Sequence, residues 1–237
     1  MGTAPVILVT RVVKNYRALR PLRVAELVVA PGERVAISGL DAAAAETFVD
    51  LLTGATLPEE GNIQVFGRDT AEIATGAEWL ASLDAFGLVT NRAVLLDGLS
   101  VVQNLAIPLT LSIEPVAPEI AARVGLLARE VGLEPAILDR QVAATEADAR
   151  MRIHLARALA LGPTALLMEH PTSSLASGSV ARFADDVRRV VADRRLTLLA
   201  LTEDREFSSV VADRVLVLNG ATGALTSASR WRWFGRR

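Results

Sequence analysis

The sequence contains no cysteine and only one lysine, Lys14. Without cysteine the chain can build neither a disulfide framework nor a thiolate metal site. Arginine carries the rest of the positive charge, and the formal net charge over 237 residues is −2 at pH 7. Because nucleic-acid binding depends on a basic patch or stripe, this balance argues against a nucleic-acid partner.

Long hydrophobic runs are also missing. The longest weakly polar stretch, residues 100–113, carries Gln103, Asn104 and Pro108 and is too short to cross a bilayer. No basic segment precedes the apolar run near the N-terminus, so we expect no secretory signal there. Hydrophobic residues nevertheless make up 51% of the chain and its mean hydropathy is +0.35, which supports a large packed core.

Short apolar runs predict strands, and apolar residues at helical spacing predict helices between them. The predicted strands are 6–13, 22–30, 34–38, 61–67, 87–90, 164–170, 196–202 and 214–220, and the later helices are 100–107, 117–131, 148–161, 178–194 and 206–211. Continuous apolar strands that alternate with helices are typical of a parallel sheet buried on both faces.

The stretch GLDAAAAETF, residues 39–48, joins a strand that ends in glycine to an apolar-periodic helix. This is the setting of a phosphate-binding loop, in which backbone N–H groups, a lysine and a metal-binding hydroxyl hold phosphates. The stretch has no lysine and no second glycine, and it contains Asp41 and Glu46. The residues of the stretch alone leave three interpretations open: a phosphate site, the remnant of a phosphate site, or a loop of another kind.

Several longer segments occur in a familiar order: PGERVAISG, EEGNIQVFGRD, GLSVVQNLAIPL, RIHLARALALGPTALLMEHPTSSL, LLALTED and VADRVLVLNG. Over about residues 9–225 the chain resembles the nucleotide-binding subunit of ABC transporters. The resemblance implies an α/β, P-loop NTPase-like ABC ATPase fold, with a mostly parallel core sheet, an antiparallel β subdomain and an inserted helical subdomain. The implied parts are 1–90 (core, first part, with the β subdomain), 91–162 (helical subdomain), 163–225 (core, second part) and 226–237 (basic aromatic tail).

The resemblance places a nucleotide site at the loop. Gly39 and Thr47 match the family's first glycine and its last threonine. Ala44 replaces the second glycine and Ala45 the lysine, while Glu46 replaces the metal-binding hydroxyl. Alanine disfavours the positive φ that glycine tolerates, and the lost lysine removes a charge beside the phosphates.

Two further residues belong to the implied nucleotide site. Tyr16 matches the aromatic residue that stacks on adenine, although a half-packed tyrosine at a strand end fits the pattern equally well. Asn91 stands where the family's glutamine contacts the metal and the attacking water, and it is one methylene shorter. No group of residues has the spacing of a metal site, so we expect no metal.

The family's catalytic positions carry Glu169, His170 and Glu203. Glu169 and His170 stand where the family has an aspartate for Mg²⁺ and a glutamate for the hydrolytic water, and Glu203 replaces a histidine. We expect His170 and Glu203 to form a hydrogen bond between two strand ends; an exchanged catalytic pair is the alternative. The family's signature segment is replaced by residues 145–149, where Thr145 and Asp148 have the spacing of a capping box.

Helix N-termini favour negative charge. We therefore hypothesise that Glu46 at one helix start, and Glu146 or Asp148 at another, replace the charge of a phosphate. The alternative is that they are surface acids without that role.

These substitutions predict a degenerate subunit that does not hydrolyse ATP and acts as a structural or regulatory partner in a transporter complex. Its expected partners are an ABC permease and an intact ATP-binding subunit, or a second copy of itself. The alternatives are an ABC-fold interaction scaffold outside transport and an ABC ATPase with rearranged catalytic residues. We expect no cofactor, since ATP and Mg²⁺ are implied by the family alone.

The tail RWRWFGRR interleaves aromatic residues with arginines. Such a composition suits a membrane headgroup region or an acidic partner, and a frayed terminus is the alternative. We expect a cytoplasmic protein that contacts the inner face of the cell membrane at its periphery.

Overall fold

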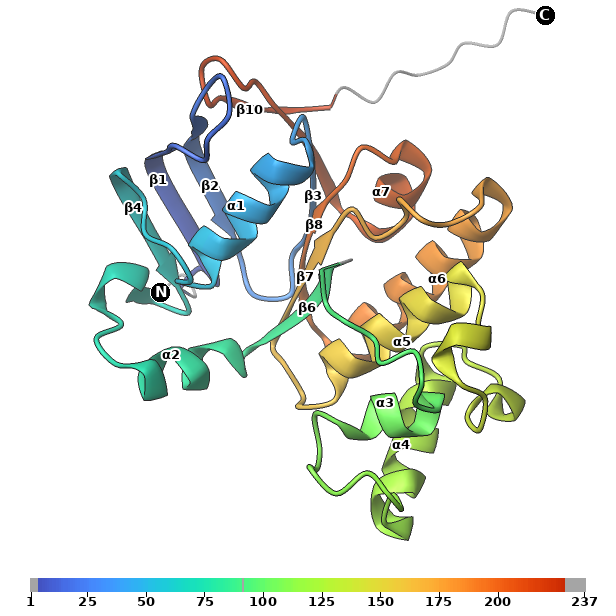
Figure 1. Cartoon of the computed structure of the whole chain (residues 1–237). Coiled ribbons are helices and arrows are strands. Elements are labelled where there is room, and N and C mark those ends of the chain that lie inside the picture. Colours follow the sequence, from blue (N-terminus) through green and yellow to red (C-terminus); the bar gives the residue numbers. More distant parts are fainter. Residues whose placement is uncertain (1–3, 91, 229–237) are drawn as a thin grey trace, which may run out of the picture.

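The computed structural model describes residues 4–90 and 92–228 (Figure 1). Asn91 and most of the predicted tail, residues 229–237, lie outside the described residues. The roles predicted for Asn91 and for the RWRWFGRR tail therefore stay predictions.

A six-stranded sheet forms the centre of the molecule, with the strand order β10-β9-β3-β8-β7-β6. Its strands are β3 (Arg34–Ser38), β6 (Phe86–Thr90), β7 (Ala165–Glu169), β8 (Thr197–Leu201), β9 (Arg214–Leu218) and β10 (Leu225–Ser227). All neighbours pair in parallel except β10, which runs antiparallel to β9. Every residue of β7 and β8 is buried, as their continuous apolar sequences predict.

A second, four-stranded sheet is antiparallel, with the order β2-β1-β4-β5. Its strands are β1 (Ile7–Lys14), β2 (Leu22–Val29), β4 (Glu60–Val65) and β5 (Arg68–Asp69). Strand β2 buries Leu22, Val24, Leu27 and Val29 and exposes the residues between them, because one face of this sheet is covered and the other meets solvent.

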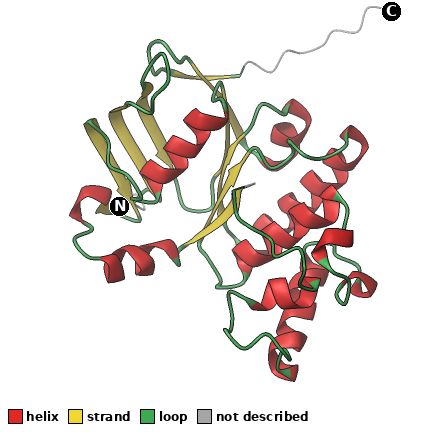
Figure 2. Ribbon diagram, viewed as in Figure 1, coloured by secondary structure: helices red, strands yellow, loops and turns green. Residues whose placement is uncertain are grey.

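Helices cover both faces of the central sheet (Figure 2). They are α1 (Ala42–Leu52), α2 (Gly76–Leu83), α3 (Val101–Ala106), α4 (Pro118–Glu130), α5 (Ala147–Leu159), α6 (Ser177–Arg194) and α7 (Arg205–Val211), with 3-10 turns at Thr70–Glu72, Pro135–Ile137 and Val142–Ala144. Helix α1 packs between the two sheets, whereas α5, α6 and α7 share the core on the opposite face with α3 and α4.

The predicted fold class is confirmed: a mostly parallel core sheet, an antiparallel β part and a block of helices between β6 and β7. Helix α2 was not predicted; it is only eight residues long and none of its residues is buried. Within the described residues, no helix combines the length and the apolar character needed to cross a membrane.

Candidate functional site

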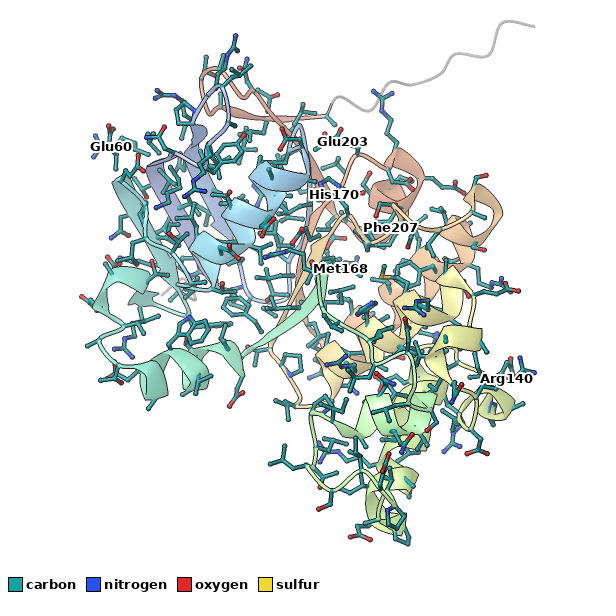
Figure 3. All side chains as sticks on the ribbon, in the orientation of Figure 1. Glu60, Arg140, Met168, His170, Glu203 and Phe207 are labelled. Atoms are coloured by element: carbon teal, nitrogen blue, oxygen red, sulfur yellow. The ribbon has the colours of Figure 1, made fainter. Side chains whose placement is uncertain are left out.

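A cleft lies at the carboxyl end of β3, where two cavities of about 660 and 760 Å³ adjoin at Leu40 and Asp41. The first cavity, here called the acidic cavity, is lined by Leu40, Asp41, Ala42, Ala43, Glu46, Arg92, Glu169, His170, Ser173 and Glu203. The second, here called the tyrosine cavity, contains Tyr16 and the start of the loop at Gly39. Figure 3 shows His170 and Glu203 close to each other at this end of the core.

Carboxylates of the chain itself occupy the loop's backbone donors. The N–H of Gly39 donates to Oε1 of Glu203 at 2.6 Å, and the N–H of Ala44 donates to Oδ1 of Asp41 at 2.8 Å. Asp41 is therefore the N-cap of α1 and supplies the negative charge that a helix start favours. The hypothesis that Glu46 supplies this charge is wrong, because Glu46 lies beyond the first turn of α1 and pairs with Arg92.

The remaining loop residues that the resemblance singled out, Ala44, Ala45 and Thr47, are packed against the protein. Ala44 and Ala45 are buried in the core between the sheets, 6% and 0% exposed. The hydroxyl of Thr47 donates to the backbone carbonyl of Ala43 at 2.8 Å, one turn back in the same helix. Alanine at these two positions thus contributes apolar packing to α1, and the loop itself brings no positive charge to the cleft.

Positive charge enters the acidic cavity from a different segment. Nη1 of Arg92 lies 3.0 Å from Oε1 of Glu46, and Nη2 lies 3.0 Å from Oε2 of Glu169 and 3.4 Å from Oδ1 of Asp50. One guanidinium therefore bridges α1 and the end of β7. Glu169 is the most buried of the three acids, with a side chain 10% exposed.

This arrangement does not fit a divalent metal. The two carboxylates at the implied metal positions, Glu46 and Glu169, face a guanidinium instead. With Arg92 in place, no three histidine or acidic side chains in the described part of the chain are grouped so that they could hold a metal ion.

His170 and Glu203 do not pair as predicted. The carboxylate of Glu203 accepts the N–H of Gly39, and the buried Nε2 of His170 has no hydrogen-bond partner among the described residues. His170 has a φ of 42°, which turns the chain sharply at the end of β7. Glu203 instead accepts from a backbone donor at the end of β3, the strand that pairs with β8.

The predicted capping box at Thr145 is also wrong. The Thr145 hydroxyl donates to the carbonyl of Val142 at 2.7 Å, and the N-cap of α5 is Glu146, without a side-chain hydrogen bond. Asp148 lies in the first turn, but its carboxylate pairs with Arg152 at 3.0 Å. An arginine one turn along the same helix attracts the carboxylate more strongly than a neutral N–H group does.

Tyr16 faces the other side of the same cleft. Burial, and then the negative charge of Asp41, raise the pKa of Tyr16 above its usual value. The tyrosine is therefore close enough to the start of α1 to sense the N-cap carboxylate. An aromatic ring at one end of the cleft and a guanidinium at the other can hold a ligand that combines a flat ring with anionic groups.

His154 lies outside the cleft, between two further cavities of about 330 and 280 Å³. It is half-buried. Burial, followed by the positive charges of Arg157 and Arg150, lowers its pKa to about 4.

The depressed pKa of His154 predicts a loss of stability in acid. The folded state binds a proton less readily than the unfolded state, so the stabilisation is complete above pH 6.5 and is lost as the pH falls towards 4. We expect this residue to account for about 2 kcal/mol of that loss. Urea unfolding at pH 7 and pH 4.5 measures it, and His154→Leu should reduce the pH dependence. Equal pH dependence in the two proteins would refute the assignment.

The fold and the cleft define an α/β nucleotide-binding cassette, and solved structures share this fold. The dimeric ATP-binding cassette MJ0796 bound to ADP and Pi aligns with a TM-score of 0.76 and 18% identity, over 93% of this chain and 98% of that one. The structure of cbiO1 from Clostridium perfringens, part of the ABC transporter complex cbiONQ, aligns with a TM-score of 0.78 and 19% identity, over 94% of this chain and 88% of that one. At these identities the likeness shows the fold alone.

The ABC transporter family model matches residues 22–173, and the chain belongs to this family. Methionine import ATP-binding protein MetN of Cereibacter sphaeroides is 34% identical over 197 residues, 82% of this chain and 54% of that protein. The chain thus spans about half the length of that relative. Lipoprotein-releasing system ATP-binding protein LolD of Coxiella burnetii is 32% identical over 235 residues, 97% of this chain and 98% of that protein.

These relatives contradict the predicted function. We expected a degenerate, non-hydrolysing structural or regulatory subunit, but relatives similar over most of the chain are named as ATP-binding proteins of import and release systems. The prediction treated the missing loop lysine as a missing charge in the cleft. It did not foresee that Arg92 enters the cleft from a segment far from the loop.

Sequence reasoning therefore missed Arg92 and Asp41. Asp41 could have been found, because an aspartate directly before a run of helix-forming alanines is a typical N-cap. The role of Arg92 was hard to predict from the sequence, since a single arginine after a strand can pair with any of several acids.

Proposed function

We propose that the chain is the ATP-binding subunit of an ABC transporter and works as a dimer with membrane permease partners. The observation that carries this proposal is the end-to-end similarity to LolD, over 97% of this chain and 98% of that protein.

Lipoprotein release is the transport process that this similarity favours. Import of a small molecule such as methionine is the second candidate, supported by 34% identity to MetN, of which the chain spans 54%. Reconstitution with each kind of permease in lipid vesicles separates the two. ATP-dependent release of a lipoprotein from the vesicle membrane supports the first, and ATP-dependent methionine uptake supports the second.

ATP would lie across both parts of the cleft. The adenine would stack on Tyr16 in the tyrosine cavity, and the phosphates would pass Leu40 and Asp41 into the acidic cavity near Arg92. The N–H groups of Gly39 and Ala44 hold carboxylates in the free chain. Phosphate oxygens could reach these donors once the two carboxylates move aside.

The adenine contact predicts a loss of ATP affinity in Tyr16→Ala. Stacking of a base on an aromatic ring contributes about 1–3 kcal/mol, so we expect the dissociation constant to rise about tenfold. Calorimetric titration of the purified chain with ATP measures it. Phe66→Ala is the matched control, because Phe66 is an exposed aromatic residue on the same β part that lines neither cavity.

The control should bind ATP like the wild type. Absence of binding at millimolar ATP would overturn the proposed function. Equal affinity of Tyr16→Ala and the wild type would overturn the position given to the adenine.

A further inference from the structure

We infer that Arg92 is the fixed cation of the acidic cavity and takes the place of a divalent metal ion. The part of this inference that concerns ATP rests on the function proposed above. The part that concerns the cation stands on the geometry of the free chain.

Three carboxylates from two elements converge on the guanidinium. Glu46 and Asp50 are four residues apart on α1 and thus lie on one face of the helix, with oxygens 3.0 and 3.4 Å from Arg92 nitrogens. Glu169 ends β7, and its oxygen is 3.0 Å from Nη2. Arg92 follows β6 closely, and in the sheet Thr90 pairs with Glu169, so the register of two parallel strands brings the arginine to the acid.

Electrostatics require a cation at this place. A carboxylate as buried as that of Glu169 is costly without a positive partner, and three more acids, Asp41, Glu46 and Glu203, line the same cavity. Arg92 is the only arginine or lysine among the described residues that line it. A planar guanidinium has donors enough for several carboxylates at once and stays charged at any physiological pH.

A guanidinium and a divalent ion cannot both serve these carboxylates. Metal oxygen ligands lie about 2.0–2.6 Å from the ion, which is inside the space that the guanidinium occupies, and the two cations repel each other. The same fork of donors matches the geometry of phosphate. The cleft should therefore accept nucleotide without Mg²⁺, with Arg92 exchanging part of its carboxylate contacts for phosphate oxygens.

Removal of the arginine should create a requirement for a divalent ion. We expect Arg92→Ala to melt at a lower temperature than the wild type, because three acids lose their partner. In this variant 10 mM MgCl2 should raise the melting temperature by about 3 °C at constant ionic strength, while the wild type should change by less than about 1 °C. Arg92→Ala combined with Glu169→Gln should respond less, since one of the ligands is then neutral.

Arg68→Ala is the matched control for lost ion pairing. Arg68 pairs with Glu78 at 3.1 Å on the surface of the β part, away from the acidic cavity, so Mg²⁺ should not restore that variant. The inference is overturned if Mg²⁺ stabilises the wild type as much as Arg92→Ala, or if it stabilises neither. Neither outcome depends on whether the chain binds ATP.

A second measurement examines the nucleotide. Wild-type affinity for ATP, measured by calorimetry, should differ less than twofold between 5 mM MgCl2 and EDTA. In EDTA, Arg92→Ala should bind ATP about tenfold more weakly than the wild type. Binding that needs Mg²⁺ in the wild type would overturn the inference. Absence of binding under both conditions would instead overturn the proposed function, and the melting experiment would still decide the role of Arg92.

Discussion

Replacement of Arg152 by alanine should lower the free energy of unfolding by about 3–5 kcal/mol. The Arg152 side chain is 3% exposed; its Nε lies 3.0 Å from Asp148, and its Nη1 lies 2.6 Å from both Asp186 and the carbonyl of Val131. Alanine would leave a buried carbonyl and a carboxylate without partners, and an uncompensated buried charge is more costly than a lost contact. Urea unfolding followed by circular dichroism gives the value.

A surface pair on a neighbouring helix provides the matched control. Arg188 pairs with Asp185 at 3.0 Å, with side chains 53% and 63% exposed. Arg188→Ala should change the free energy of unfolding by less than about 1 kcal/mol, since exposed pairs are screened by water. If Arg152→Ala lowers the free energy of unfolding no more than Arg188→Ala does, the contacts of Arg152 do not stabilise the packing of the helices. Arg152→Met should fall between the two, because it restores the lost apolar volume.

Arg152 matters because of the elements that it joins. It lies on α5 and reaches the first turn of that helix, the end of α4 and the middle of α6. It also lies over the ring of Phe183, 5.8 Å from the ring centroid. Gly132 makes room for it, because a Cβ at that position would come within 2.6 Å of Nη1. The start of α5 is thereby fixed relative to the core.

The strands and most helices could be predicted, because the spacing of their apolar residues shows which face of each element is buried. The segment RVAIS forms β3 over the predicted residues, and the helix predicted over 178–194 begins at Ser177 and ends at Arg194. Helix α2 was missed because its eight residues are fewer than the roughly 11–18 over which helical spacing can be recognised.

The charged contacts of the cleft could not be predicted, because they depend on which distant segments fold beside each other. Glu203 was expected to pair with His170, yet it accepts the N–H of Gly39, 164 residues away in the sequence. Arg92, just after β6, reaches Glu169 at the end of the neighbouring strand β7, 77 residues away in the sequence. Each acid has several potential partners in the sequence, and only the packed fold selects one. A missing lysine in a motif is therefore weak grounds for predicting a lost function.

Gly39→Ala should destabilise the chain by about 3–5 kcal/mol and disturb the cleft. Gly39 has a φ of 91°, and a Cβ at this position would lie 2.4 Å from the carbonyl oxygen of Leu218. That oxygen belongs to β9, which pairs in parallel with β3, so neither strand can yield without breaking the sheet. Backbone strain of about 1–3 kcal/mol and overpacking of about 1–3 kcal/mol add up to the expected loss. Thermal and urea unfolding measure it.

Gly32→Ala separates the two causes. Gly32 has a φ of 73°, but a Cβ there would meet no atom within 4 Å, so this variant has backbone strain alone and should lose about 1–2 kcal/mol. Equal losses in the two variants would show that the contact with Leu218 costs nothing. The two should also differ in ATP affinity, because the Gly39 N–H faces the cleft, where Glu203 accepts it, whereas Gly32 lines neither cavity. The glycine that begins the loop is therefore required by the neighbouring strand, independently of any phosphate.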